Sequence, residues 1–168
     1  MEVMHNLIAI IMLHLNGKRA LAKYYDPKYE TTPFERQIYS KTKSQKAKDD
    51  IFVIDNAMVV HRYVAELHIY VVGNRKENPL VLERVLNCLV EVTSTLLSKG
   101  AEQKPLVDHL DKFIVMFDEV CDQGTILETD PNLVLDRVCL KKNVAEQSLA
   151  SVLQSASDQM RFPWIYRT

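Results

Sequence analysis

Two histidines that could bind a metal ion lie on segments that the sequence predicts to be neighbouring strands. If Ala65-Glu66 is a tight turn between them, His61 faces Tyr70 and Tyr63 faces His68, with all four side chains on one side of the sheet. A zinc site needs further ligands from Cys, Asp or Glu, and the spacing places none on this face. Cross-strand aromatic packing is therefore the favoured interpretation, and a small metal-dependent enzyme using His61 and His68 is the alternative.

The other groups with catalytic potential lack partners at a suitable spacing. Asp108, His109 and Asp111 lie on one expected helix, where residues one and two apart do not face each other. Cys88 could act as a nucleophile, but it adjoins the apolar stripe of a long expected helix and no base is paired with it. The chain has no G-x-S-x-G, H-E-x-x-H or P-loop motif. We therefore expect no enzyme activity, no cofactor and no bound metal.

Composition indicates one globular domain in a reducing compartment. The 168 residues carry a formal net charge of −1, so the chain as a whole is a poor electrostatic ligand for nucleic acid or an anionic membrane. Three cysteines without CxxC spacing, each on an expected helix, are typical of reduced cytosolic thiols. The apolar run from Leu7 to Leu13 is shorter than the ~20 residues of a membrane helix, and no basic signal-peptide region precedes it.

The elements that position these residues begin with a hairpin. Leu7 to Leu13 is apolar at nearly every position, which is typical of a central strand covered on both faces. Asn16-Gly17 predicts a hairpin turn into a second strand, Arg19 to Tyr25. Thr32-Pro33-Phe34-Glu35 has the form of a capping box and predicts the start of a helix.

Three further strands and two helices follow. Ile51–Ile54, Ala57–Val64 and Leu67–Val72 are joined by two-residue connections, which are too short for a parallel crossover and so require antiparallel pairing. Asn78-Pro79 predicts the cap of a long helix. A second helix with apolar residues from Leu106 to Val120 is expected to end at Gly124. The order of elements indicates an α+β layer architecture.

The C-terminal part of the sequence has features of its own. Asp130-Pro131 predicts the N-cap and first turn of a short helix that ends near Leu140. Beyond it we expect an amphipathic helix and then an aromatic tail, which could dock on this domain or on a partner. The apolar residues of this last helix are Leu149, Val152, Leu153, Ala156 and Met160, and those of the tail are Phe162, Trp164, Ile165 and Tyr166.

Lysines crowd the end of the first expected helix, at positions 41, 43, 46 and 48. Cations there favour the helix dipole, so a solvated helix end is the simpler interpretation. Asp49 and Asp50 follow at once, which also favours it. A patch that binds phospholipid or a partner is the alternative.

Short segments spread over the whole chain carry a family resemblance: Gly17 to Tyr25, Phe34 to Ile38, Val59 to Tyr63, Val71 to Gly73, Asn78 to Val90, Phe117 to Val120 and Gly124 to Pro131. They resemble the small chains of vesicle coats, a longin-type family that includes small subunits of clathrin adaptors and of coatomer. The segment Leu127 to Pro131 and the tail from Ser151 onward favour the zeta branch of coatomer over the sigma chains of clathrin adaptors. Ala20 stands where sigma chains that bind acidic dileucine signals carry an arginine, which argues against such binding.

The resemblance implies a fold, partners and a location. Residues 1–125 would form a longin-like α+β domain with a five-stranded antiparallel sheet flanked by helices, and residues 126–168 a C-terminal helical extension with an aromatic tail. The chain would pair with the helical solenoid of the gamma subunit of coatomer. An Arf-type GTPase would recruit the complex to the cytosolic face of Golgi membranes for retrograde transport, with no nucleic acid or small-molecule substrate involved. The expected interface residues are Leu82, Leu86, Leu89, Phe162, Trp164 and Tyr166.

Two non-enzymatic alternatives stay open from the sequence. The chain could be a sigma chain of a clathrin adaptor that takes part in cargo sorting. It could also be a free longin domain that regulates a SNARE or a GTPase. These alternatives share the fold and differ in the chains with which the protein assembles.

Overall fold

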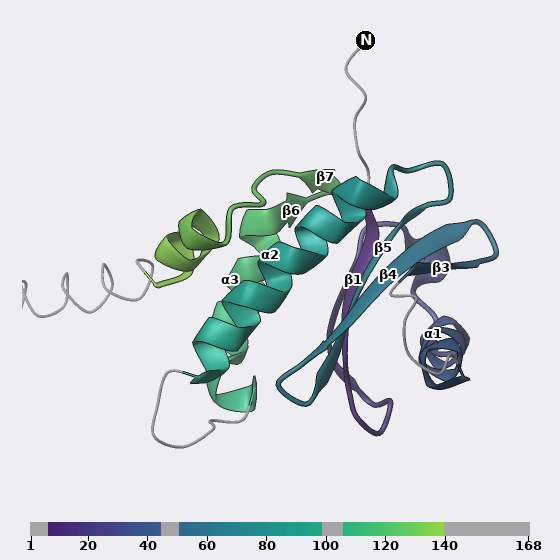
Figure 1. Cartoon of the computed structure of the whole chain (residues 1–168), viewed down its shortest axis with the longest axis horizontal. Helices are drawn as coiled ribbons and strands as arrows, with labels where there is room; N and C mark the ends of the chain where they lie inside the picture. The colour runs from purple at the N-terminus through teal and green to yellow at the C-terminus, as the bar shows by residue number, and fades with distance from the viewer. Residues whose placement is uncertain (1–6, 45–50, 99–105, 140–168) are drawn as a thin grey trace, which may run out of the picture.

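The protein folds as an antiparallel sheet between one helix on one face and two on the other, in a computed structural model that describes residues 7–44, 51–98 and 106–139 (Figure 1). The main sheet has the strand order β2-β1-β5-β4-β3, and β6 pairs only with β7. The strands are β1 Leu7–His14, β2 Arg19–Tyr24, β3 Ile51–Ile54, β4 Ala57–Val64, β5 Leu67–Asn74, β6 Cys121–Asp122 and β7 Thr125–Ile126. The helices are α1 Thr32–Ser44, α2 Pro79–Ser98, α3 Leu110–Val120, the 3-10 turns η1 Pro27–Tyr29 and η2 Leu106–His109, and a helix of residues 131–139.

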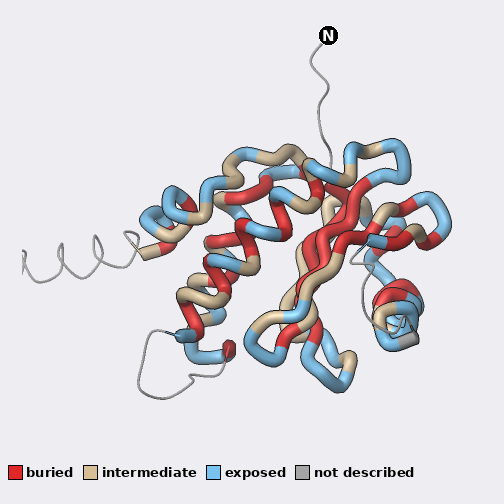
Figure 2. The backbone as a smooth tube through the Cα atoms, in the orientation of Figure 1, coloured by how far each residue is buried: buried red, intermediate tan, exposed pale blue. Residues whose placement is uncertain are grey.

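The central strand β1 explains why the sheet needs helices on both faces. Every residue from Leu7 to Leu13 is buried, as the uninterrupted apolar run predicts. One set of side chains enters a core with α2 and α3, and the other enters a core with α1. The buried strands lie between the helical layers in Figure 2. Residues of the first core include Ile10, Met12, Leu86 and Phe117, and residues of the second include Ile11, Leu13, Ile38 and Tyr70.

The turns between strands confirm the predicted pairing, with one correction. Ala65 and Glu66 both take positive φ, 47° and 66°, which matches the two-residue turn expected between β4 and β5. The first hairpin instead uses a four-residue connection, residues 15–18, with a register shift between Met12 and Leu13. Gly17 alone of the Asn-Gly pair takes positive φ, 78°, and the Asn16 side chain accepts a hydrogen bond from the Lys18 N–H at 3.0 Å.

The predicted capping box of α1 does not form. Thr31 Oγ1 caps the helix by accepting from the Phe34 N–H at 3.3 Å. The Glu35 carboxylate turns away to β2, where Arg19 Nε lies 2.8 Å away and the Tyr24 hydroxyl donates at 2.7 Å. Glu35 is buried, and a buried carboxylate is costly unless charged or hydroxyl groups pair with it. The contacts with β2 supply such partners, whereas the helix end already has its cap from Thr31. Arg19 is thereby engaged within the domain.

The helix α3 ends at Val120 rather than at Gly124. The chain continues as the β6–β7 hairpin, in which Gln123 and Gly124 take φ values of 47° and 84°. Gly124 therefore provides the left-handed residue of a hairpin turn and not a helix cap, and its carbonyl accepts from the Leu7 N–H at 2.7 Å. As a result Cys121 lies in a strand and not, as expected, in a helix.

The start of the C-terminal extension follows the prediction. Asp130 Oδ1 accepts from the Asn132 N–H at 2.9 Å, and residues 131–139 form a helix. Val134 and Val138 of this helix are buried in the core that α2 and α3 share with the sheet. No helix in the described ranges is long and apolar enough to cross a membrane. The expected last helix and the aromatic tail lie outside the described residues.

Candidate partner-binding surface

The histidine pair forms part of an aromatic cluster on the α1 side of the sheet. His61 pairs with Tyr70 and Tyr63 with His68 across β4 and β5, as predicted. His61 Nε2 and His68 Nδ1 lie 2.9 Å apart, and the His61 ring stacks on Tyr70 with a centroid distance of 4.7 Å. At that separation one imidazole donates and the other accepts, so their facing nitrogens satisfy each other. Residues 7–44, 51–98 and 106–139 contain no group of three or more ligands that could hold a metal ion.

Burial keeps both histidines neutral. It lowers the pKa of His61 to about 4, with further contributions from His68 and Arg62. Burial also lowers the pKa of His68, helped by the Lys43 ammonium group. Because a second proton would break the shared hydrogen bond, acid acts against the folded state here. The pair is therefore a structural feature that is sensitive to acid.

Replacing His61 by phenylalanine should make the free energy of unfolding depend less on pH in the acid range. The unfolded histidine titrates near pH 6.5 and the folded one near pH 4, so the unfolded state binds more protons between these values. The contribution is complete above pH 6.5 and is lost as the pH falls toward 4. Between those values the wild-type protein should lose about 2 kcal/mol more stability than the variant. Urea unfolding at several pH values measures this, and parallel profiles would contradict it.

The Cys88 thiol, the candidate nucleophile, is buried. Its side chain is 2% exposed on α2. Burial raises its pKa to about 12, and the nearby carboxylates of Glu128 and Asp130 add to the effect. The thiolate that nucleophilic chemistry requires is therefore disfavoured.

The three leucines of α2 that we expected at a partner interface are buried in the domain itself. Leu82, Leu86 and Leu89 are 0%, 1% and 0% exposed, because the sheet requires an apolar helix face to cover it. The outward side of α2 instead carries Arg84, Asn87 and Glu91, which are exposed. Phe162, Trp164 and Tyr166 lie outside the described residues. Along the middle of this helix a partner would meet polar side chains, and Leu80 in its first turn is the exposed large apolar residue.

An exposed apolar stripe lies on α3 and the turn before it. Val107, Leu110 and Ile114 are 73%, 36% and 46% exposed. Their spacing of three and four residues places them within an arc of about 60° on the helix surface. Leu110 and Ile114 belong to the apolar residues that the sequence places on this helix. The buried Phe113 and Phe117 lie with them in one arc of about 100°, so the apolar period alone does not distinguish the exposed pair from the buried one.

Contacts with β2 hold the stripe in place. Lys23 Nζ lies 2.5 Å from the Asp118 carboxylate, four residues beyond Ile114, in a pair exposed on both sides. The Tyr25 hydroxyl donates to the Cys121 carbonyl at 3.3 Å. Burial raises the pKa of Tyr25, so the hydroxyl keeps its proton and remains a donor. These contacts fix α3 over the β2 edge of the sheet and leave its apolar stripe facing outward.

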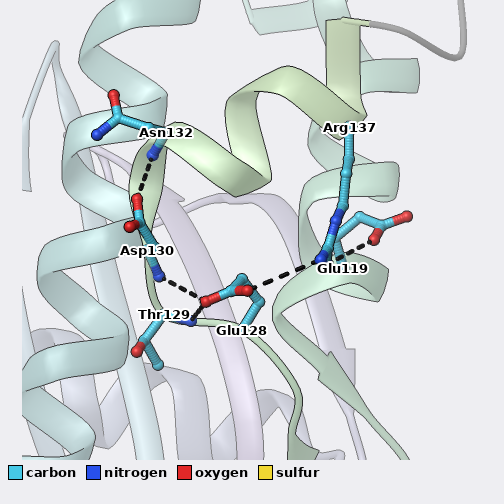
Figure 3. A network of polar contacts seen from close by, with 6 residues as sticks. All are labelled: Glu119, Glu128, Thr129, Asp130, Asn132 and Arg137. Atoms are coloured by element: carbon cyan, nitrogen blue, oxygen red, sulfur yellow. Dashed lines mark hydrogen bonds and ion pairs between the residues drawn. The ribbon is translucent and has the colours of Figure 1, made fainter.

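A polar network joins the C-terminal extension to α3 (Figure 3). The Glu128 carboxylate accepts from the N–H groups of Thr129 and Asp130 at 2.9 and 3.0 Å. These two bonds, the one from Asp130 first, lower the pKa of Glu128. The Arg137 guanidinium lies 3.5 Å from Glu119 of α3 and 3.8 Å from Glu128. The acids of this segment therefore orient the helix of residues 131–139, and Asp130 caps it as predicted.

Comparison with known proteins defines the class. A sequence profile described as clathrin adaptor complex small chain matches residues 6–145. In structure the chain is similar to one chain of a homology model of the full-length AP-3 complex in a stretched open conformation. The TM-score is 0.63 at 14% identity, over 86% of this chain and 98% of that one, which shows a common fold. The chain belongs to the clathrin adaptor small chain family.

Within that family the similarity is to the zeta subunits of coatomer, as the sequence resemblance predicts. Coatomer subunit zeta-1 of Homo sapiens is 36% identical over 166 residues, which cover 95% of this chain and 93% of the human protein. The zeta-1 protein of Arabidopsis thaliana is 30% identical over 95% of this chain and 97% of its own length. The similarity therefore includes the C-terminal extension.

Proposed function

We propose that this protein is a non-catalytic structural subunit of the COPI coatomer. The observation that carries the proposal is the 36% identity to coatomer subunit zeta-1 over 95% of the chain, with both lengths nearly fully covered. The neutral, buried state of the candidate nucleophile Cys88 also supports a role without catalysis. The protein would act by burying surface against other coat subunits.

The partner in this proposal is the helical solenoid of the gamma subunit. A solenoid presents helix surfaces, and an exposed apolar stripe with helical spacing suits packing against such a surface. Val107, Leu110 and Ile114 would provide the apolar centre of the contact. Exposed acids beside them, Asp108 and Asp111, would form part of its polar rim.

The C-terminal region would extend this contact. We propose the division made from the sequence, a domain of residues 1–125 and an extension of residues 126–168. The buried Val134 and Val138 support docking of the start of the extension on the domain. Phe162, Trp164 and Tyr166 would then add aromatic contacts with the partner.

The assembled complex would be recruited to the cytosolic face of Golgi membranes by an Arf-type GTPase, for transport to the endoplasmic reticulum and within the Golgi. Affinity purification of the tagged chain from its own cells, followed by mass spectrometry, tests the proposal. We expect the gamma subunit and the other coatomer chains. Recovery of clathrin adaptor subunits would instead show a sigma-type chain, and recovery of the chain alone would favour a free longin domain.

A further inference from the structure

Carboxylates border the apolar stripe of α3 on one side only. Asp111 and Asp118 are both exposed and lie seven residues apart, so they share one side of the helix, about 10 Å from each other along its axis. Around the helix they lie roughly 60° and 40° beyond Ile114. On the other side of the stripe, Phe113 and Phe117 are buried in the domain. The stripe therefore has acids along its outer side and the domain core along its inner side.

Asp108, Asp111 and Asp118 form what we call the acidic rim. Asp108 is exposed in η2, and within residues 7–44, 51–98 and 106–139 neither it nor Asp111 forms an ion pair or a side-chain hydrogen bond. Asp118 pairs with Lys23, but both side chains stay partly open to solvent, at 55% and 33% exposed. Lys112, the cation of α3, is half-buried and lies about 100° around the helix from Asp111, away from the stripe. The rim therefore keeps a net negative charge.

The sign of this charge limits what can cover the stripe. Nucleic acid and anionic bilayers carry the same sign and are repelled by the acidic rim. An apolar centre with a charged border is instead the usual anatomy of a protein interface. A protein that packs on Leu110 and Ile114 also removes water from Asp111 beside them, which is costly unless a cation or a hydrogen-bond donor replaces that water.

We propose that the partner surface on the α3 stripe carries lysine or arginine side chains along one side of its apolar centre, where they meet the acidic rim. The inference rests on the proposed function, in which the partner is a helical solenoid, and it gives the chemistry of the helix that makes the contact. Charge complementarity of this kind raises the association rate and fixes the register of an interface. Because the rim borders the stripe on one side only, it also determines which way round the partner helix lies.

Release of the gamma subunit from the tagged, full-length chain by rising sodium chloride tests the proposal. We expect the retained fraction to fall severalfold between about 0.1 and 0.5 M salt, because salt screens contacts between exposed charges. Asp108→Asn/Asp111→Asn should bind about fivefold more weakly at the lower salt concentration and match the wild type at the higher one. The control Glu30→Gln/Asp55→Asn removes two exposed carboxylates, beside η1 and in the β3–β4 turn, and should match the wild type throughout. Thermal unfolding checks that both variants are folded.

Three results would overturn the proposal while leaving coat membership standing. They are retention of the gamma subunit that does not depend on salt, equal retention by the Asp108→Asn/Asp111→Asn variant and the wild type at low salt, and a loss in that variant that persists at high salt. The proposed function fails separately. If the chain recovers clathrin adaptor subunits with the expected dependence on salt and on the two aspartates, coat membership is refuted and the basic partner surface is supported. A chain that recovers only further copies of itself would refute both.

Discussion

Replacing Leu110 and Ile114 together by aspartate should remove nearly all of the gamma subunit recovered with this protein. A hot-spot side chain at the centre of an interface contributes about 2 kcal/mol or more, and two carboxylates introduced there would also be desolvated, so the double change should weaken binding by about a hundredfold or more. The folded domain should tolerate the change, because both side chains are substantially exposed in the chain alone. Quantitative mass spectrometry of affinity-purified complexes measures the loss.

Leu80→Asp provides the matched control. Leu80 is 69% exposed in the first turn of α2, where an added carboxylate suits the helix dipole, and it lies apart from the α3 stripe in sequence. This variant should recover the gamma subunit as well as the wild type does. If the double variant also recovers it fully, the stripe is not the partner surface.

Replacing Gly124 by valine should destabilise the domain by about 4 kcal/mol. Gly124 has a φ of 84°, which a β-branched residue rarely adopts, and an added Cβ would lie 2.9 Å from the Leu7 carbonyl oxygen. Because that oxygen belongs to the backbone of the central strand, it cannot move aside cheaply. The variant should also weaken the hydrogen bond from the Leu7 N–H to the Gly124 carbonyl. Urea denaturation measures the change in the free energy of unfolding.

Gln123→Gly tests whether the effect arises at Gly124 or anywhere in the turn. Gln123 has a φ of 47°, a conformation that glycine adopts without strain. We expect this variant to match the wild type within about 1 kcal/mol. If the Gly124→Val variant has the same urea midpoint as the wild type, the close approach between the β6–β7 hairpin and β1 is refuted.

Local patterns were sufficient to predict the strands and the antiparallel pairing of those that follow one another along the chain. The two-residue connection at Ala65-Glu66 fixes the register of β4 and β5, and through it the facing of His61 with Tyr70. The apolar run of β1 indicates a strand covered on both faces because it is too short for a helix buried on all sides. Asp130-Pro131 contains its own cap and first turn, so the start of the next helix required no information from elsewhere.

The errors arose where a distant part of the chain decides the outcome. Glycine can supply the left-handed residue of a helix end or of a hairpin turn, and the sequence does not distinguish the two. Gly124 lies in a hairpin turn, where its carbonyl accepts a hydrogen bond from the Leu7 N–H. The apolar period of α2 shows which side of the helix is buried, but not whether the domain or a partner covers it. Leu86 packs against the sheet of its own domain. Glu35 has the spacing of a capping residue, yet Arg19 and Tyr24 of β2 bind it instead.

The composition of the complex recovered with the tagged, full-length chain tests the central claim most directly. If the protein is a coatomer subunit, mass spectrometry should find the gamma subunit at a ratio near one to one, together with the other coatomer chains. Its recovery should depend on the stripe of Val107, Leu110 and Ile114. Recovery of clathrin adaptor large chains in place of coatomer, or of a stable monomer alone, would contradict the account.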